Sequence, residues 1–259
     1  MESIICDTNI WYNIANKKND EFQLRGVELI GTSINIIEIS STPNILNNID
    51  LVVEAIRSMH KHCYELIIHN PIEHIITLFH DNYIPNCTVE KKLLAGFNIL
   101  MSIDIHSISV ESFMQAEKQI NNSIAQNNDL IERINSGLPF IKEKIKNLGK
   151  SNYRRNVFLD EWKKFFSELI SEYSKKYCDM EYTLDLNSNK WDQLEFFLYT
   201  WEYYFKNNIE FGNWKLNNND WNDLLNLVYV QPGFKYWTLE KKWNRIYMES
   251  DKLRLYMHS

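Results

Sequence analysis

Four acidic residues occupy comparable places along the chain and point to a metal site. Asp7 comes directly after the first short apolar run, and Glu38 lies in a helix-like stretch just after the second. Asp223 lies in the helix-like stretch before the later run "FKYWT" (residues 234–238), and Glu240 lies two residues after the end of that run. Carboxylates that are gathered in one place repel each other and raise one another's pKa, and a divalent cation removes that cost. Hard oxygen ligands suit Mg²⁺ or Mn²⁺, so the chemistry predicted is that of a magnesium or manganese centre.

Each of these acids also has a purely structural explanation. Asp7 is placed to cap the helix that follows it, and Asp223 with Asp220 resembles a capping pair in the first turn of a helix. Glu240 is placed to interact with a helix dipole, and Glu38 suits a solvated helix face. The structural explanation is favoured for each acid taken alone. Their common placement beside expected strand ends favours the metal site when the four are taken together.

Alternating strand-like and helix-like stretches are expected to position these acids. Short apolar runs indicate strands, and apolar residues three and four positions apart indicate helices. The expected strands are residues 3–6, 27–31, 104–110, 234–238 and 253–258. The expected helices are residues 8–15, 34–40, 44–82, 89–101 and the stretches flanking 234–238. This order predicts an α/β fold with a parallel sheet, in which ligands collect at the carboxyl ends of the strands.

The middle of the chain is predicted to be a large helical insertion, residues 111–214, within a single domain of residues 1–259. Aromatic residues at helical spacing run through residues 158–177, and packing is a commoner use of such a stripe than base stacking. Residues 142–155 carry six Lys or Arg and one Glu. A charge run of this kind is usually a solvated loop, with an auxiliary RNA contact as the alternative.

The motifs that hold the acids resemble those of the PIN domain, a family of metal-dependent ribonucleases. The similarity covers residues 1–110 and 215–259 and rests on "IICDTNIWYNIA", "TSINIIEIS" and "NDWNDLLNLVYVQPGFKYWTLEKKW". It implies a three-layer α/β/α fold with a central parallel sheet. The family pattern has Asp, followed by Thr or Ser and Asn, after the first strand and Glu on the second helix. It ends with Asp on a late helix and an acid two residues after a Thr. Glu240 departs from the usual Asp there and lengthens the reach to a metal.

The resemblance implies an endoribonuclease that hydrolyses RNA phosphodiester bonds with a water activated by Mg²⁺ or Mn²⁺. The implied catalytic and metal-binding residues are Asp7, Glu38, Asp223 and Glu240, with Asp220 as an auxiliary. The implied substrate-binding residues are Thr8, Asn9, Thr238, Lys241, Lys242 and Arg245. In this scheme the first three orient a water or the phosphate, and the basic residues steer the RNA backbone.

Net charge, cysteine spacing and hydropathy argue against several other classes of protein. The formal net charge is −6, so a polyanion has to be held by a local basic patch. The four cysteines show no C-x-x-C spacing, and the cluster of His60, His62 and Cys63 lacks a second pair of ligands, so zinc is not expected. The sequence shows no leader-like region and no apolar run as long as a membrane span. A cytoplasmic protein without a membrane partner is therefore expected.

Two other functions remain open. A haloacid-dehalogenase-like phosphohydrolase also places an Asp after its first strand, but it would need a second Asp where Asn9 stands and a late G-D-x-x-D. A non-catalytic PIN-like binding module is compatible with Glu240. RNA, single-stranded RNA included, is the expected substrate, and a second copy of the chain or a protein regulator remains open as a partner. The sequence also leaves open whether DNA is cut, whether one or two metal ions bind, and whether the protein is a toxin, a phage-defence effector or an RNA-processing enzyme.

Overall fold

The computed structural model describes residues 1–16, 24–41, 48–85, 95, 97–98, 101, 128, 131–140, 142–143, 153–178, 180–208 and 215–258. The chain divides into two compact units. Unit 1 comprises Met1–Pro71, Asn86–Asn127 and Gly233–Ser259, and unit 2 comprises Ile72–Pro85 and Asn128–Pro232. The division differs from the predicted core and insertion, because residues 215–232, expected in the core, belong to unit 2.

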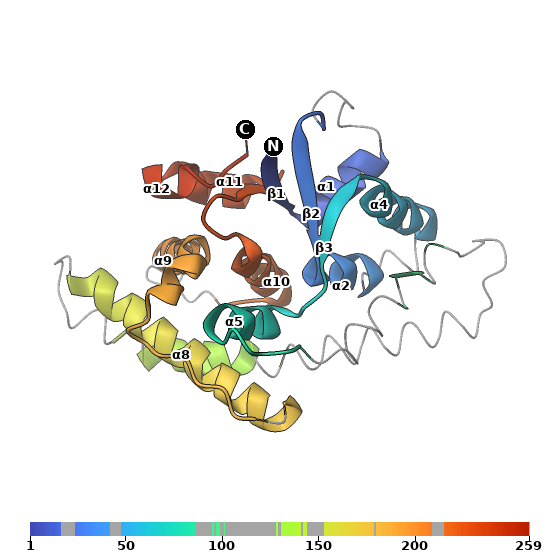
Figure 1. Ribbon diagram of the computed structural model, residues 1–259. Coiled ribbons are helices and arrows are strands. Elements are labelled where there is room, and N and C mark those ends of the chain that lie inside the picture. Colours follow the sequence, from blue (N-terminus) through green and yellow to red (C-terminus); the bar gives the residue numbers. More distant parts are fainter. Residues whose placement is uncertain are drawn as a thin grey trace. The chain divides into compact units, whose positions relative to one another are not determined.

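A four-stranded parallel sheet forms the centre of unit 1, in the order β3-β2-β1-β4 (Figure 1). Parallel neighbours need crossover connections, which here run through helices and, between β1 and β4, through most of the chain. The prediction of an α/β fold with a parallel sheet is confirmed. The strands are β1 (Glu2–Cys6), β2 (Val27–Thr32), β3 (Cys63–Ile67) and β4 (Lys235–Trp237).

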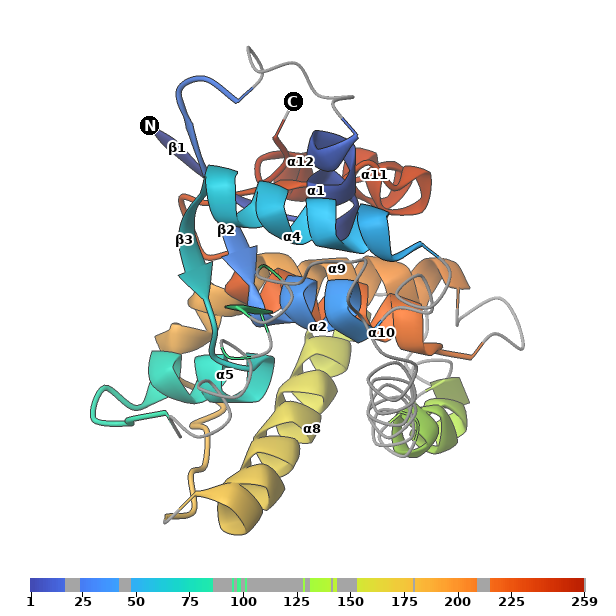
Figure 2. The same cartoon turned by 90° about the vertical axis from the view of Figure 1, so that its right-hand side faces the viewer.

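Among the described residues of unit 1, five helices with given bounds accompany the sheet. They are α1 (Thr8–Ala15), α2 (Ser33–Ser41), α4 (Ile49–His62), α11 (Lys241–Met248) and α12 (Asp251–Arg254). Helix α4 lies alongside α1 (Figure 2), and both contribute to a buried apolar core. This core is built from aliphatic side chains of β1 and β2 with Trp11 of α1 and Met59 of α4.

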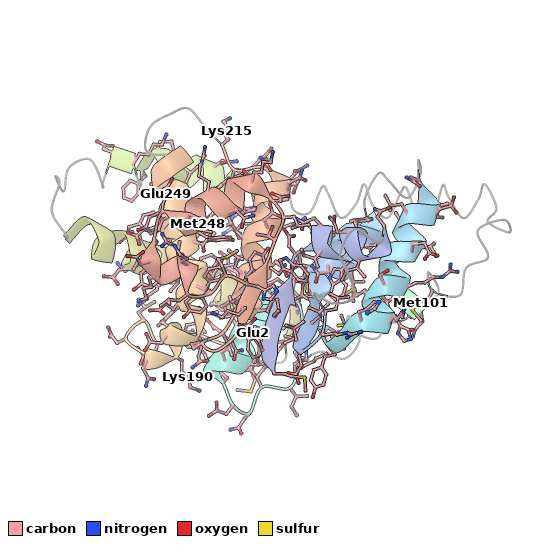
Figure 3. The ribbon with its side chains drawn as sticks, turned by 90° about the horizontal axis from the view of Figure 1, so that it is seen from above. Glu2, Met101, Lys190, Lys215, Met248 and Glu249 are labelled. Atoms are coloured by element: carbon pink, nitrogen blue, oxygen red, sulfur yellow. The ribbon has the colours of Figure 1, made fainter. Side chains whose placement is uncertain are left out.

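Helices cover both faces of the sheet. Successive strand residues point to opposite faces. In β4, Trp237 joins the core shared with α1 and α4, while its neighbour Tyr236 contacts the ring of Tyr247 on α11. Figure 1 accordingly draws α1 and α4 on one side of the strands and α11 and α12 on the other. Glu2, labelled in Figure 3, marks the beginning of β1, and its carboxylate pairs with the ring of His258 at 2.9 Å.

Two predicted elements differ from the structure. The helical pattern expected over residues 44–82 is confirmed in part, by α4 and by the helix Pro71–Phe79, but β3 separates the two. Tyr64 of this edge strand is 70% exposed, so no buried alternation marks it. Residues 253–258 were expected to form a strand, but the first two of them belong to α12. The Ser250 hydroxyl accepts the Leu253 N–H and caps this helix. Only Met257 makes an isolated bridge to β4. The strand expected at residues 104–110 lies outside the described residues.

All the regular secondary structure that the structure describes in unit 2 is helical. Its elements are α5 (Pro71–Phe79), α8 (Tyr153–Tyr177), η2 (Asn189–Leu194), α9 (Glu195–Asn208), α10 (Asn218–Asn226) and η3 (Leu227–Tyr229). Trp162 of α8 is buried with its ring 4.5 Å from that of Trp201 on α9. Phe158 and Phe166 are buried on the same face of α8. The expectation that this aromatic stripe forms a core is confirmed. No helix among the described residues is both long enough and apolar enough to cross a membrane.

Candidate active site

The register of the sheet brings Asp7 beside Thr238. Cys6 pairs with Trp237, so the next residue of each strand lies at the same carboxyl edge. The Asp7 N–H donates to the Trp237 carbonyl at 2.9 Å, and the Thr238 hydroxyl donates to Oδ2 of Asp7. These two residues are 231 positions apart in the sequence. The sheet therefore joins the first and last predicted motifs at one point.

The Asp7 carboxylate accepts hydrogen bonds from three donors. Its Oδ1 accepts the Thr8 N–H at 2.6 Å, which makes Asp7 the N-cap of α1. Its Oδ2 accepts from Nδ2 of Asn9 at 2.6 Å and from the Thr238 hydroxyl. The capping role weighed as an alternative is thus real. The bonds from Asn9 and Thr238 go beyond what a cap needs.

The direction of each of these bonds follows from backbone donors. Oδ1 of Asn9 accepts the Leu239 N–H at 3.1 Å, so the side of Asn9 that faces Asp7 is the NH₂ group. The Thr238 oxygen accepts the Glu240 N–H at 3.1 Å, which leaves its hydrogen for Asp7. An ionised carboxylate is a pure acceptor, so three donors directed at Asp7 favour its charged form. We name this arrangement of Asp7, Thr8, Asn9 and Thr238 the Asp7 junction.

Burial opposes the charge of Asp7. The residue is 3% exposed, and desolvation raises the pKa of its carboxyl group. The hydrogen bond from Thr238 lowers this pKa, and the negative charge of Glu240 raises it again, with a balance at about 6 instead of 3.8. Glu240 is therefore close enough for its charge to act on Asp7. A cation at the junction would relieve both effects.

Glu38 is linked to Asp7 through Thr8. The Thr8 hydroxyl donates to Oε2 of Glu38, while the Thr8 N–H donates to Asp7. Burial and the charge of Glu38 raise the pKa of Tyr12 to about 12, so Glu38 also faces the second turn of α1. Helix α2 carries Glu38 to this place because it begins directly after β2, at the same edge of the sheet as α1.

Glu240 is exposed at the N-cap position of α11, and its side chain makes no capping hydrogen bond there. Lys241 and Arg245 follow it on the exposed side of the same helix. The ammonium group of Lys242 lies 4.5 Å from the centre of the Trp243 ring. The basic residues predicted to hold substrate thus sit on α11, the helix that begins beside Thr238. Of the basic residues in 142–155, only Lys142 has a described side chain.

Asp223 lies in unit 2, apart from the other three acids in the division of the chain. It stands in the second turn of α10 and not in the first, as predicted, because Asn217 caps this helix by accepting the Asp220 N–H at 2.9 Å. Asp220 occupies the first turn, where its buried carboxylate accepts a hydrogen bond from the Tyr204 hydroxyl. Burial and this bond raise the pKa of Tyr204. Asp220 thus stabilises the packing of α9 against α10 within unit 2 through this hydrogen bond.

The described residues include no group of three or more His, Cys, Asp or Glu side chains arranged to hold a metal ion. The described geometry therefore joins Asp7, Glu38 and Glu240 by hydrogen bonds and electrostatics, without gathering them into a closed ligand set.

Asn35 is a residue of this region that the sequence analysis missed. It is fully buried on α2, and its side-chain NH₂ group donates to the Thr8 hydroxyl at 3.1 Å. A polar residue within the apolar stretch "SINIIEIS", three positions before Glu38, was the available signal.

Comparisons with protein-family models, with curated proteins and with solved structures find no match to this chain.

Proposed function

We propose that the chain is a PIN-like, Mg²⁺- or Mn²⁺-dependent endoribonuclease whose active site is built on the Asp7 junction. One observation carries this proposal. A buried carboxylate stands at the carboxyl edge of a parallel sheet, where ligands of such sheets bind, and three donors hold it in the charged form. A buried charge is costly unless it is paired, and the junction itself contains no cation among its described side chains.

The donor chemistry of the junction fits a hard divalent cation. Its candidate ligands are all carboxylate oxygens, which Mg²⁺ and Mn²⁺ prefer. Asp7 accepts one hydrogen bond on Oδ1 and two on Oδ2, so Oδ1 keeps capacity for a further partner. Asp7, Glu38 and Glu240, all in unit 1, would hold the ion. When bound, such an ion acidifies water and offsets charge on phosphoryl oxygens.

Thr8, Asn9 and Thr238 would position carboxylates in this scheme. Their side-chain hydrogens already point to Glu38 or Asp7, so they orient the acids and leave the phosphate to other donors. Lys241 and Arg245 would attract the RNA backbone, because they are exposed on the helix that begins beside Thr238.

A non-catalytic PIN-like binding module is the second candidate. It is favoured by the capping of α1 by Asp7 and by the lack of a closed ligand set among the described acids. In that case the acids would stabilise helix starts and RNA would be bound without being cut.

Cleavage of labelled single-stranded RNA separates the two candidates. The expected result is cutting that requires Mg²⁺ or Mn²⁺, stops with a chelator and falls at least a hundredfold in Asp7→Asn, because an amide cannot replace the charged ligand. Asp50→Asn is the matched control: it removes a first-turn acid from α4 of the same unit and should cut at the wild-type rate. RNA binding without metal-dependent cutting would support the binding module instead.

A further inference from the structure

We infer that Asn35 is a positioning residue of this site: it fixes the direction of the Thr8 hydroxyl and thereby holds Glu38 beside Asp7. The inference rests on the proposed function, since it assigns a role toward the proposed metal ligands. All the residues it concerns belong to unit 1, and Asn35, Thr8 and Trp11 are buried.

The orientation of the Asn35 amide is fixed by two groups that can only donate. Its Oδ1 accepts the Thr32 N–H at 3.0 Å and the indole N–H of Trp11 at 3.3 Å. The opposite side of the amide must then be the NH₂ group, and this side faces the Thr8 hydroxyl oxygen at 3.1 Å. Thr8 therefore accepts from Asn35.

A hydroxyl has one hydrogen, and the Asn35 donor decides where that hydrogen goes. Because Thr8 accepts from Asn35, its hydrogen is directed to Oε2 of Glu38. The N–H of Thr8 is bonded to Asp7 at the same time. One residue at the start of α1 thus donates to both carboxylates with two separate hydrogens, and Asn35 selects this arrangement over its reverse.

Helix capping alone does not explain the Asn35 side chain. Thr32 and Asn35 form a reciprocal cap at the start of α2: the Asn35 N–H donates to the Thr32 hydroxyl at 3.3 Å and the Thr32 N–H donates to Oδ1 of Asn35. An Asp in this position would make the same two bonds. Only the NH₂ group is specific to Asn, and its partner is Thr8.

The substitution Asn35→Asp separates the two roles. It keeps the cap and the acceptor for the Trp11 indole, but it replaces the donor to Thr8 with an acceptor, so the Thr8 hydroxyl turns to residue 35 and away from Glu38. The experiment measures Mn²⁺ affinity by titration calorimetry and RNA cleavage for Thr8→Val in the wild-type and Asn35→Asp backgrounds. Comparing within each background cancels the direct effect of the added charge.

Thr8→Val is expected to weaken Mn²⁺ binding about tenfold in the wild-type background and less than twofold in the Asn35→Asp background. The turnover number should follow the same pattern, while KM for RNA stays constant, because the phosphate-binding residues are untouched. Trp11→Phe is the control: it removes the other side-chain partner of Asn35 and a part of the core but leaves the donor to Thr8. It should lower the melting temperature without changing Mn²⁺ affinity by more than twofold.

An equal cost of Thr8→Val in both backgrounds would overturn the role of Asn35 and leave the proposed function intact. A wild-type protein that neither binds Mn²⁺ nor cuts RNA would overturn both. Circular dichroism establishes that each variant is folded. Should Asn35→Asp fail to fold, Asn35→Ala takes its place. It removes the donor that orients the Thr8 hydroxyl without adding an acceptor, so Thr8→Val should cost less there than in the wild-type background, and an equal cost would again overturn the role of Asn35.

Discussion

A buried carboxylate such as that of Asp7 is stable only when its charge is compensated, and its own neighbours supply part of this compensation. Three hydrogen bonds stabilise the anion, whereas burial and the charge of Glu240 oppose it. The compensation is incomplete, since the pKa of Asp7 stays raised at about 6. At the scale of single residues, this incomplete compensation is what the proposed cation would supply.

The raised pKa predicts that the stability of the metal-free protein depends on pH. The pKa of Asp7 is about 6 in the folded chain, compared with the ordinary value of 3.8 that applies to the unfolded chain. The folded state therefore binds a proton at Asp7 more tightly than the unfolded state does. The resulting stabilisation is fully present below about pH 4 and is lost as the pH rises through about 6. The change amounts to about 3 kcal/mol and can be measured by chemical denaturation across this range.

Asp7→Asn provides the control for this pH dependence, because an amide does not titrate. The variant should lose the part of the pH profile that Asp7 contributes. Saturating Mn²⁺ should also shift the wild-type profile toward lower pH, since the ion competes with the proton. Superimposable profiles of wild type and Asp7→Asn would show that Asp7 is not the titrating group.

At the scale of elements, the sheet positions the site through close packing as well as register. Gly31 of β2 lies under α4 and β3, where an added Cβ would meet the Met59 methyl at 2.3 Å, Leu66 at 3.0 Å and the Cys63 sulfur at 3.2 Å. The missing side chain lets these groups pack directly on the strand that precedes α2 and Glu38.

Gly31→Ala is expected to destabilise unit 1 by about 1–3 kcal/mol, because the interior has no room for a further methyl group. Urea denaturation measures the loss. Gly137→Ala is the control: it lies in the helical stretch 131–140, and no atom lies within 4 Å of its added Cβ. That variant should gain up to about 1 kcal/mol from helix propensity. An unchanged midpoint for Gly31→Ala would mean that the packing above this strand yields easily.

The elements that the sequence predicts well are those whose burial leaves a clear pattern. Residues 3–6 and 27–31 are short apolar runs that lie in strands of the sheet, and the expected strand 234–238 contains β4. The edge strand Cys63–Ile67 has exposed positions and continues a helical pattern, so composition hides it. Residues 253–258 look like a strand, but the cap at Ser250 decides for a helix.

The residues of the candidate site are likewise predictable only where the sequence pattern marks their position. Asp7, Glu38 and Glu240 could be identified because they follow expected strand ends. Asn35 could not, since its role depends on which of its two amide atoms faces Thr8, and only packing of α1 on α2 decides that. The predicted place of Asp223 in the first turn is wrong by one helical turn, because Asn217 caps α10 and the helix begins at Asn218.

At the scale of the whole molecule, charge bears on how the proposed RNA substrate would approach. The net charge of −6 repels a polyanion, so the proposed binding would depend on local cations such as Lys241 and Arg245 of α11. The charged stretch 142–155 is the other concentration of basic residues, and most of it lies outside the described residues.

Removing both exposed cations of α11 should weaken RNA binding in a salt-dependent way. In an Asp7→Asn background, which prevents cutting, Lys241→Ala with Arg245→Ala should lower the slope of log affinity against log salt by about two, one unit for each lost phosphate contact. The control is Arg57→Ala with Lys61→Ala, which removes the same charge at the same spacing from α4. Equal slopes for both pairs would direct the search for the RNA path to residues 142–155.

A divalent ion bound beside Asp7 is the central feature of the proposed function, and Fe²⁺-directed cleavage of the polypeptide locates such an ion most directly. Fe²⁺ with ascorbate and peroxide generates radicals that cut the backbone next to the bound metal. We predict cuts near Asp7, Glu38 and Glu240. Excess Mg²⁺ and the Asp7→Asn substitution should suppress all of them. Cuts elsewhere in the chain, or cuts that persist in Asp7→Asn, would contradict the account.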